Sequence, residues 1–473
     1  MKRTLSVILS LLILLPAFAA QEAEKNSAPV KEHLQNHFKI YGFIRNYFVF
    51  DSRESKAGTG DLFYYLPLDN KWNTSTLSNP AREDLNASPN FRFLALTSRV
   101  AFDVSGYYIN NLHFGAKVEG DFYSGLSKLT STTGLSGNTN VSGTAQARLR
   151  QAYVTLTWKD LAMKGEQTAQ VGLKIGQAWH PMAADMPHVF GLETGAPFGP
   201  FSRTPQVTVD ASLGKNWIVS ASAIWQQQYM SAGPDGASAS YQKYACTPEA
   251  YAGVSYKGKD FLVRGGVDVV SIKPRNIGKN ADGLTVHVKD RKTSVLGFLY
   301  GQYSYKMLQV KAKTTFGEGG EHMNLMSGYA VVDKSDPTNW KYASLINSSS
   351  WVSASYGKKW QGVLFLGYAK NFGLAKPAEE GYVKKSDVYF CSNGFSNINQ
   401  LYRINPQGLY NFGKFTVGVE YQWTAVQYGK YINGELKDTN ETVELLNGIG
   451  LPWKDTLHWV GNHRVNVMVK FTF

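Results

Sequence analysis

The chain has 473 residues, and its 49 lysines and arginines outnumber its 36 aspartates and glutamates, which gives a formal net charge of +13. Aromatic residues make up 13% of the sequence and charged residues only 18%, proportions that exclude a disordered chain. The basic residues are dispersed rather than clustered, which argues against a nucleic-acid-binding protein. Two cysteines, Cys246 and Cys391, are too few for a disulfide scaffold, and whether they form one bridge between surface loops stays open.

Residues 1–20 have the pattern of a secretory signal peptide. Lys2 and Arg3 precede a short apolar run, and a small-residue cleavage site follows at Ala19 and Ala20. Removal of this segment leaves a mature net charge of +11. Residues 21–36 are polar, and we expect a short periplasmic lead-in there.

From residue 37 to residue 473 the sequence predicts an all-β chain. Apolar and polar residues alternate in segments of about ten residues, separated by Gly, Asn, Ser and Asp clusters. The segment LHFGAKVEGDF places Phe114 and Val118 on one face and Lys117 and Glu119 on the other. Charged residues on one face of a strand are typical of a wet surface, and a sandwich and a membrane barrel both satisfy this pattern.

The connections between the predicted strands decide between these two folds. Long connections such as 123–146 and 178–204 alternate with mostly short ones such as 213–215 and 358–360, although 406–414 is longer. This asymmetry is typical of a transmembrane antiparallel up-and-down β-barrel with long extracellular loops and short periplasmic turns. Sixteen strands are predicted, near residues 38–50, 92–105, 111–122, 147–158, 168–177, 205–212, 216–227, 245–256, 261–272, 292–304, 307–316, 349–357, 361–370, 397–405, 415–426 and 462–473.

Aromatic residues gather beside the short turns, among them Trp158, Trp217, Tyr256 and Trp360. Amphipathic rings prefer the membrane interface, so this position indicates a periplasmic aromatic girdle. The chain also ends on an alternating strand that finishes at Phe473. Since a terminus frays unless it is tied down, we expect this strand to close the barrel against the first one.

Several of these segments together resemble Gram-negative outer-membrane porins of the sixteen-stranded, usually trimeric type. The resemblance rests on KIYGFIRNYFVFD, SRVAFDV, KVEGDF, RLRQAYVTL and the terminal aromatic strand. LKIGQAWHPM and SRTPQV are similar to the DcaP-like porins, although residues 21–36 are shorter than the helical lead-in typical of that group. The resemblance implies an outer-membrane location, a homotrimer, passive transport without a cofactor, and Phe473 as the signal read by the barrel-assembly machinery.

If the apolar faces contact outer-membrane lipid, the opposite faces line the channel. Placing a Lys or Arg on the lipid face near the bilayer midplane costs about 2 to 4 kcal/mol of folding free energy, so the charged faces are expected to point into the channel. Arg150 shares the parity of lipid-facing residues, so either it lies above the membrane or a β-bulge reverses its direction. The predicted pore-lining residues on the strands are Arg99, Lys117, Glu119, Asp121, Arg150, Lys174, Arg264, Asp268, Lys311, Lys313 and Glu420.

In porins of this type the loop after the fifth strand folds into the barrel, and here that loop is 178–204. Its charged residues Asp185, Glu193 and Arg203 are predicted constriction residues, expected to meet the basic wall residues Arg99, Lys117 and Lys174. The alternative, an ordinary extracellular loop with solvated charges, stays open. His180 and His188 have no positioned third ligand in the sequence, so no metal site is assigned to them.

The favoured hypothesis is therefore a porin for small polar solutes, with a mild preference for anions because basic residues exceed acidic ones. The alternative is an adhesive or structural barrel that binds an external partner through its long loops. No local signature of a catalytic nucleophile with its base is present, and an enzyme is not expected.

Overall fold

The computed structural model describes residues 37–58, 63–73, 83–95, 98–124, 145–162, 168–191, 193–435 and 441–473. The expected signal peptide (1–20) and lead-in (21–36) lie outside these residues. Regular structure in the described residues is almost entirely β-strand, and the six-residue helix α3 (Ser240–Ala245) lies in a loop. The predicted fold class is therefore confirmed.

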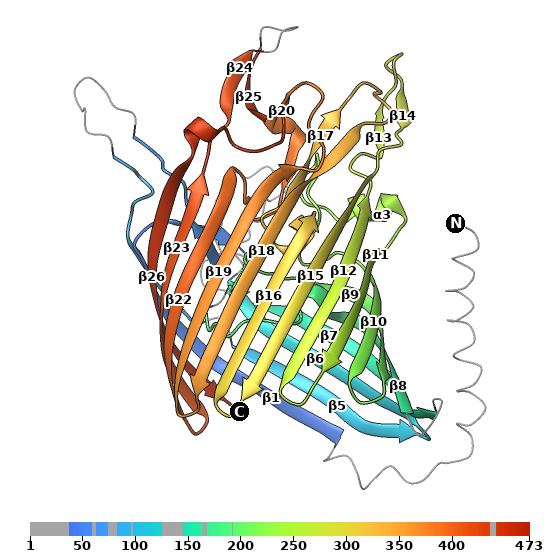
Figure 1. The fold of residues 1–473 in the computed structure, drawn as a ribbon, viewed down its shortest axis with the longest axis vertical. Coiled ribbons are helices and arrows are strands. Elements are labelled where there is room, and N and C mark those ends of the chain that lie inside the picture. Colours follow the sequence, from blue (N-terminus) through green and yellow to red (C-terminus); the bar gives the residue numbers. More distant parts are fainter. Residues whose placement is uncertain are drawn as a thin grey trace.

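Within the described residues, sixteen antiparallel strands close into a barrel (Figure 1). They are β1 (Phe38–Asp51), β5 (Arg99–Ile109), β6 (Leu112–Ser124), β7 (Ala145–Ala162), β8 (Thr168–Trp179), β9 (Arg203–Leu213), β10 (Trp217–Ile224), β11 (Glu249–Lys257), β12 (Phe261–Ile272), β15 (Lys292–Tyr305), β16 (Leu308–Glu318), β18 (Lys341–Gly357), β19 (Trp360–Leu374), β22 (Ile398–Phe412), β23 (Phe415–Tyr428) and β26 (His458–Thr472). Each overlaps a strand that the sequence predicted, although β5 begins seven residues later, β18 begins eight residues earlier and β22 ends seven residues later than predicted.

The first and last strands close the barrel. β26 pairs with β1 from Phe43 opposite Thr472 to Asp51 opposite Arg464. At the chain end, Gly42 and Phe473 exchange two backbone hydrogen bonds of 3.2 and 3.1 Å. The other edge of β1 pairs with β5, so no strand edge of this closed sheet is left without a partner.

Short turns gather at one end of the barrel, together with the carboxyl terminus, and long loops gather at the other (Figure 1). The longer connection expected at 406–414 is wrong, because β22 continues to Phe412. Pro406 lies inside this strand opposite Leu364, and the ladder to β23 is interrupted at Asn405 and Pro406. A proline lacks the N–H that the ladder needs, and the sheet tolerates the gap at this position.

The long loops carry their own regular structure, which the sequence did not predict. Several short strands rise above the barrel at the end opposite the turns (Figure 1). The strands within the loops are β2 (Ser55–Gly58), β3 (Phe63–Pro67), β13 (Ile277–Lys279), β14 (Thr285–His287), β17 (Gly328–Asp333), β20 (Tyr382–Lys384), β21 (Val388–Phe390), β24 (Ile432–Glu435) and β25 (Thr442–Asn447), and 3-10 helices span Pro181–Ala183, Glu321–Met323, Lys385–Asp387 and Lys454–Thr456. The short strand β4 (Asn90–Leu94) lies instead in the wall, where it pairs with β1.

The outer surface of the barrel is apolar, as the alternation predicts. Phe102, Val118 and Val154 are each about half exposed, whereas Glu119 and Asp121 on the opposite face are buried. Near the turns, aromatic rings stack in pairs such as Trp360 and Tyr410, whose centroids are 4.4 Å apart. Each strand thus presents apolar side chains on its outer face and polar side chains on its inner face.

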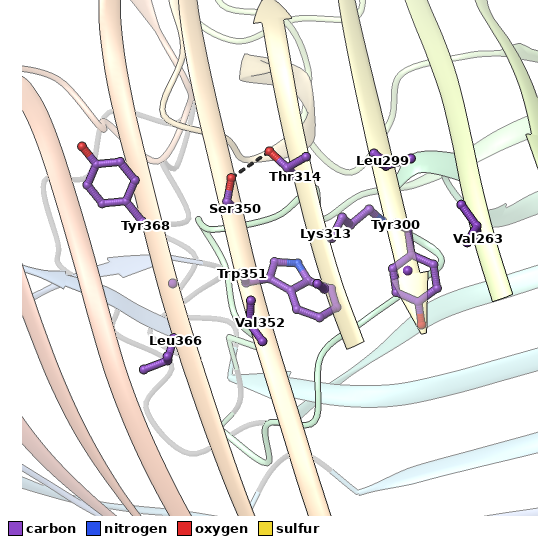
Figure 2. Close-up of a pocket in the computed structure, with 13 residues that line it drawn as sticks. Val263, Leu299, Tyr300, Lys313, Thr314, Ser350, Trp351, Val352, Leu366 and Tyr368 are labelled. Atoms are coloured by element: carbon purple, nitrogen blue, oxygen red, sulfur yellow. Dashed lines mark hydrogen bonds between the residues drawn. The ribbon is translucent and has the colours of Figure 1, made fainter. Parts of the chain in front are cut away.

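A shallow hollow of about 590 Å³ interrupts the outer wall over β12 to β19 (Figure 2). Thr314 and Ser350 form its floor, and their hydroxyl groups hydrogen-bond to each other over 2.8 Å. This bond satisfies two polar groups that the apolar face leaves without water. The next residues along the same strands, Lys313 and Trp351, are only 2% exposed and belong to the interior.

The interior is less polar than the sequence suggested. Loop residues and inward-facing wall residues pack into an apolar cluster, in which the ring of Phe198 lies 6.0 Å from that of Phe365. Twelve of its 25 buried members in the described chain come from loop segments and the other thirteen lie on barrel strands, so the cluster joins the loops to the wall. The loop members include Tyr65, Leu66, Met182, Ala196, Phe198, Phe201, Tyr229, Met323, Leu325, Met326, Cys391 and Phe395.

Candidate functional site

The segment of residues 180–202, named the inward loop below, joins β8 to β9 and packs against the inner wall. His188 N–H donates to Ser353 Oγ of β18 over 2.9 Å, and Gly191 N–H donates to Glu420 Oε2 of β23 over 3.2 Å. The hydroxyl of Tyr47 on β1 donates to the carbonyl of Phe190. These contacts reach strands far from β8 and β9, so the described part of the loop lies inside the barrel.

Asp185 of the inward loop is bound by a basic wall residue. Arg264 Nη1 on β12 lies 2.8 and 3.0 Å from the two oxygens of Asp185, and Arg264 Nε donates to Ser255 Oγ over 3.1 Å. Lys313 on β16 donates to the carbonyls of Met182 and Asp185. One side of the inward loop is thus anchored to β12 and β16.

Glu193 anchors the other side. Its Oε1 accepts hydrogen bonds from Arg403 Nη1 over 3.2 Å and from Gln422 Nε2 over 2.7 Å, and Arg464 Nη1 lies 3.8 Å away. Glu193 and Arg403 are buried. Sequence reasoning missed Arg403, because its inward neighbour on the same face is the apolar Leu401. The sequence did contain one indication that Arg403 faces inward, because it directly precedes Ile404, which faces outward.

Glu420 has only neutral hydrogen-bond donors among the described residues. Asn466 Nδ2 donates to its Oε1 over 2.8 Å, Gln422 donates to the same oxygen, and Gly191 N–H binds Oε2. The predicted inward orientation of Glu420 therefore brings it to the inward loop rather than to open lumen.

Arginines and acids on β5, β6 and β7 form a buried ladder. Arg150 Nε lies 2.6 Å from Glu119 and its Nη1 lies 2.7 Å from Asp121. Arg148 binds both oxygens of Asp121 at 2.9 Å. Arg150 was expected either to lie above the membrane or to be reversed by a β-bulge, and the structure shows a bulge. The register between β6 and β7 shifts beside Arg150, and this shift turns its side chain inward.

The expected contacts of Arg99, Lys117 and Lys174 with the inward loop are not among the described interactions. Arg99 lies 3.7 Å from Glu119, and Lys117 lies 3.2 Å from Asp103. Lys174 lies over the ring of Tyr153. The described contacts of these cations are with groups on their own or neighbouring strands, which strand parity alone does not specify.

Three further predicted residues are cations with neutral partners in the described chain. Arg203 Nε donates to Gln228 over 3.0 Å, and its guanidinium lies 5.0 Å from the centre of the Trp179 ring. Lys311 donates to the carbonyl of Met186 over 3.3 Å, and Lys313 donates to the carbonyls of Met182 and Asp185. Arg203 also borders a cavity of about 520 Å³ beside Arg148.

Asp268 lies in a buried cluster with His180, Glu249 and His322. His180 lies 2.6 Å from Glu249 and 3.6 Å from Asp268, and His322 lies 3.3 and 3.7 Å from the same two carboxylates. His188 lies apart and contacts Gln309. Sequence reasoning treated the two histidines of the inward loop as structural and did not foresee this cluster, because its other members come from β11, β12 and the loop after β16.

The cysteines do not pair. Cys246 is exposed at the end of α3, whereas Cys391 is buried, which corrects the expectation that both lie in surface loops. Burial raises the pKa of the Cys391 thiol to about 12. Its thiolate population near neutral pH is therefore negligible.

Comparison with known proteins identifies the fold. The outer-membrane channel DcaP of Acinetobacter baumannii aligns over 92% of this chain and 97% of its own, with 15% identity and a TM-score of 0.57. The anion-selective porin from Comamonas acidovorans (9% identity, TM-score 0.49) covers 92% and 99% of the two chains, and the trimer form of OmpT from Vibrio cholerae (12%, 0.45) covers 92% and 99%.

No family profile and no curated protein sequence matches the chain. Among its described residues, no helix combines the length and apolarity required to cross a membrane. The sixteen-stranded closed barrel of this chain aligns with the DcaP structure over 92% of the chain. The chain thus has the fold of a Gram-negative outer-membrane porin with sixteen strands.

Proposed function

We propose that the protein is an outer-membrane channel through which small polar solutes diffuse passively, that the inward loop forms its constriction, and that it prefers anions. The observation that carries this proposal is the attachment of the inward loop to two separate wall strands, to β12 through Asp185 with Arg264 and to β22 through Glu193 with Arg403. A loop tied at two such points occupies part of the cross-section, and the remaining space limits the size of a solute.

The preference for anions rests on the charges that remain after pairing. Lys174, Arg203, Lys311 and Lys313 have neutral partners among the described contacts. Most predicted acids have cationic partners instead, as Glu119, Asp121, Asp185 and Glu193 do. A surplus of cations beside a constriction raises the local concentration of anions and lowers that of cations.

Selectivity is tested by the reversal potential of the purified protein in a planar bilayer under a salt gradient. Wild type is expected to favour anions, and Lys311→Gln combined with Arg203→Gln is expected to move the reversal potential toward zero. Lys259→Gln, in the turn before β12, is the control and should leave it unchanged. Cation selectivity of the wild type refutes the anion preference.

We further propose a homotrimer in outer-membrane lipid, inserted by the barrel-assembly machinery that reads Phe473. The trimer form of the Vibrio protein supports this assembly by analogy of fold. Light scattering of the detergent-solubilised protein measures the mass, and a monomeric mass contradicts the trimer.

A further inference from the structure

Four buried side chains meet inside the barrel at a place that the channel account does not use. Glu249 is the first residue of β11 and Asp268 lies in β12. His180 begins the inward loop, and His322 lies in the 3-10 helix Glu321–Met323 of the loop after β16. Each of the four side chains is at most 3% exposed.

The hydrogen bonds of His180 define its role in the cluster. Its Nδ1 accepts from the N–H of Met182 over 3.1 Å, so that nitrogen carries no proton. The ring proton is therefore on Nε2, which donates to Glu249 Oε1 over 2.6 Å. His180 is thus a neutral group that orients the Glu249 carboxylate, and it cannot balance the charge of that carboxylate.

The remaining groups are left with unused ligand atoms. Among the described residues, Asp268 Oδ1 and both ring nitrogens of His322 have no hydrogen-bond partner. Two carboxylates buried this deeply need a positive charge beside them. The nearby Lys292 lies 3.2 Å from a third acid, Glu321, and is therefore already paired.

The spacing of these atoms suits a divalent metal ion. His322 Nε2 lies 3.3 Å from Glu249 Oε1 and 3.7 Å from Asp268 Oδ2. Ligand bonds of about 2.0 to 2.1 Å at tetrahedral angles separate neighbouring ligand atoms by roughly 3.3 Å, and imidazole with carboxylate is an accepted ligand set for zinc. One nitrogen of His180 and one oxygen each of Glu249 and Asp268 also lie within 4.8 Å of one another.

We propose that Glu249, Asp268 and His322 bind one divalent cation of the zinc type, with His180 as the outer partner that orients Glu249. Ligating carboxylates are themselves held by hydrogen bonds from outer partners, and His180 supplies such a bond to Glu249. The cation joins the loop after β16 to the wall strands β11 and β12, next to the start of the inward loop. It is a structural clamp, and its binding is independent of whether the pore conducts.

The test is a titration of the folded, chelator-washed mature protein in detergent with ZnCl₂, followed by competition with a chromophoric chelator. One equivalent per chain is expected. Glu249→Gln and His322→Ala are expected to weaken zinc binding at least about tenfold. His180→Ala removes the residue that orients Glu249 and is expected to weaken zinc binding about ten- to hundredfold. His287→Ala changes an exposed histidine of β14 and should leave the affinity at the wild-type value.

Heat-modifiable migration on gels first shows whether each variant is folded. If His322→Ala does not fold, the zinc affinity of the isosteric variant Glu249→Gln decides the test. X-ray absorption of the zinc-loaded wild type should give nitrogen and oxygen ligands. The proposal is overturned if wild type takes up no zinc at millimolar concentration, if Glu249→Gln binds as wild type does, or if the spectrum shows a sulfur ligand.

Discussion

Arg403 of β22 and Glu193 of the inward loop form a buried ion pair of 3.2 Å between residues 210 positions apart in the sequence. Arg403 also donates to the carbonyl of Tyr65 in the β2–β3 hairpin and to Thr424 Oγ1 of β23. A single guanidinium therefore joins the wall, the inward loop and the first extracellular hairpin. Arg403 thus fixes Glu193 of the inward loop relative to both the wall and the hairpin.

Replacing Arg403 is expected to release that side of the inward loop. Arg403→Gln leaves Glu193 buried without its closest cation, a change that costs about 3 to 5 kcal/mol of unfolding free energy. Single-channel conductance in planar bilayers should rise, and urea unfolding followed by tryptophan fluorescence should occur at lower urea. The double variant with Glu193→Gln should recover part of the stability, because the uncompensated charge is gone.

The Arg150 ladder gives a second stability prediction. Arg150→Ala leaves Glu119 without its 2.6 Å partner and Asp121 with Arg148 alone, and the unfolding free energy should fall by about 3 to 5 kcal/mol. Glu119→Gln added to Arg150→Ala should restore part of the loss. If the single variant unfolds as wild type does, the ladder does not support the wall.

Closure of the barrel is testable at Gly42. A Cβ at this position meets the backbone oxygen of Arg99 at 2.1 Å and the ring of Phe473 at 2.9 Å. Gly42→Val is therefore expected to impair closure between β1 and its two neighbours. The fraction of heat-modifiable protein in outer-membrane extracts measures the effect, and Gly362→Val in β19, where the added Cβ meets no atom within 4 Å, is the control.

Deletion of Phe473 removes the two backbone hydrogen bonds to Gly42 and the proposed assembly signal. Insertion into the outer membrane should fall more than the conductance of those channels that do insert. Quantitative blotting of membrane fractions, paired with bilayer recordings, separates the two effects. Normal insertion of the truncated chain contradicts the proposed role of the terminal residue.

The two cysteines should differ in reactivity. A membrane-impermeant maleimide applied to intact cells should label Cys246, which is exposed beside α3 at the long-loop end. Cys391 should stay unlabelled because burial raises its pKa to about 12 and excludes the reagent. Cys246→Ser should abolish labelling and Cys391→Ser should not; labelling from the periplasmic side alone contradicts the orientation.

Period-two alternation predicted the strands and their two faces, because each strand must present an apolar face to lipid and a polar face inward, and the alternation of long and short connections then favoured a barrel over a sandwich. The strand period placed Lys313 and Glu420 correctly on inward faces. It did not specify partners, since pairing depends on register and on loops. The bulge that turns Arg150, the inward-facing Leu401 beside Arg403, and the apolar ring of Phe198 in the interior follow from three-dimensional packing, which no strand period records.

The His180 cluster shows the same limit. Its members are separated by up to 142 positions and come from a loop start, two strands and a second loop. The sequence therefore offered two isolated histidines on the inward loop, whereas the fold brings one of them to Glu249 and leaves His188 on Gln309.

The most direct test of the channel is single-channel recording of the purified wild-type protein in a planar bilayer. We expect discrete ohmic steps, with a reversal potential that favours anions in a salt gradient, and larger steps from Arg403→Gln. Bilayers that stay silent although the protein is folded and inserted would contradict the channel and favour an adhesive or structural barrel.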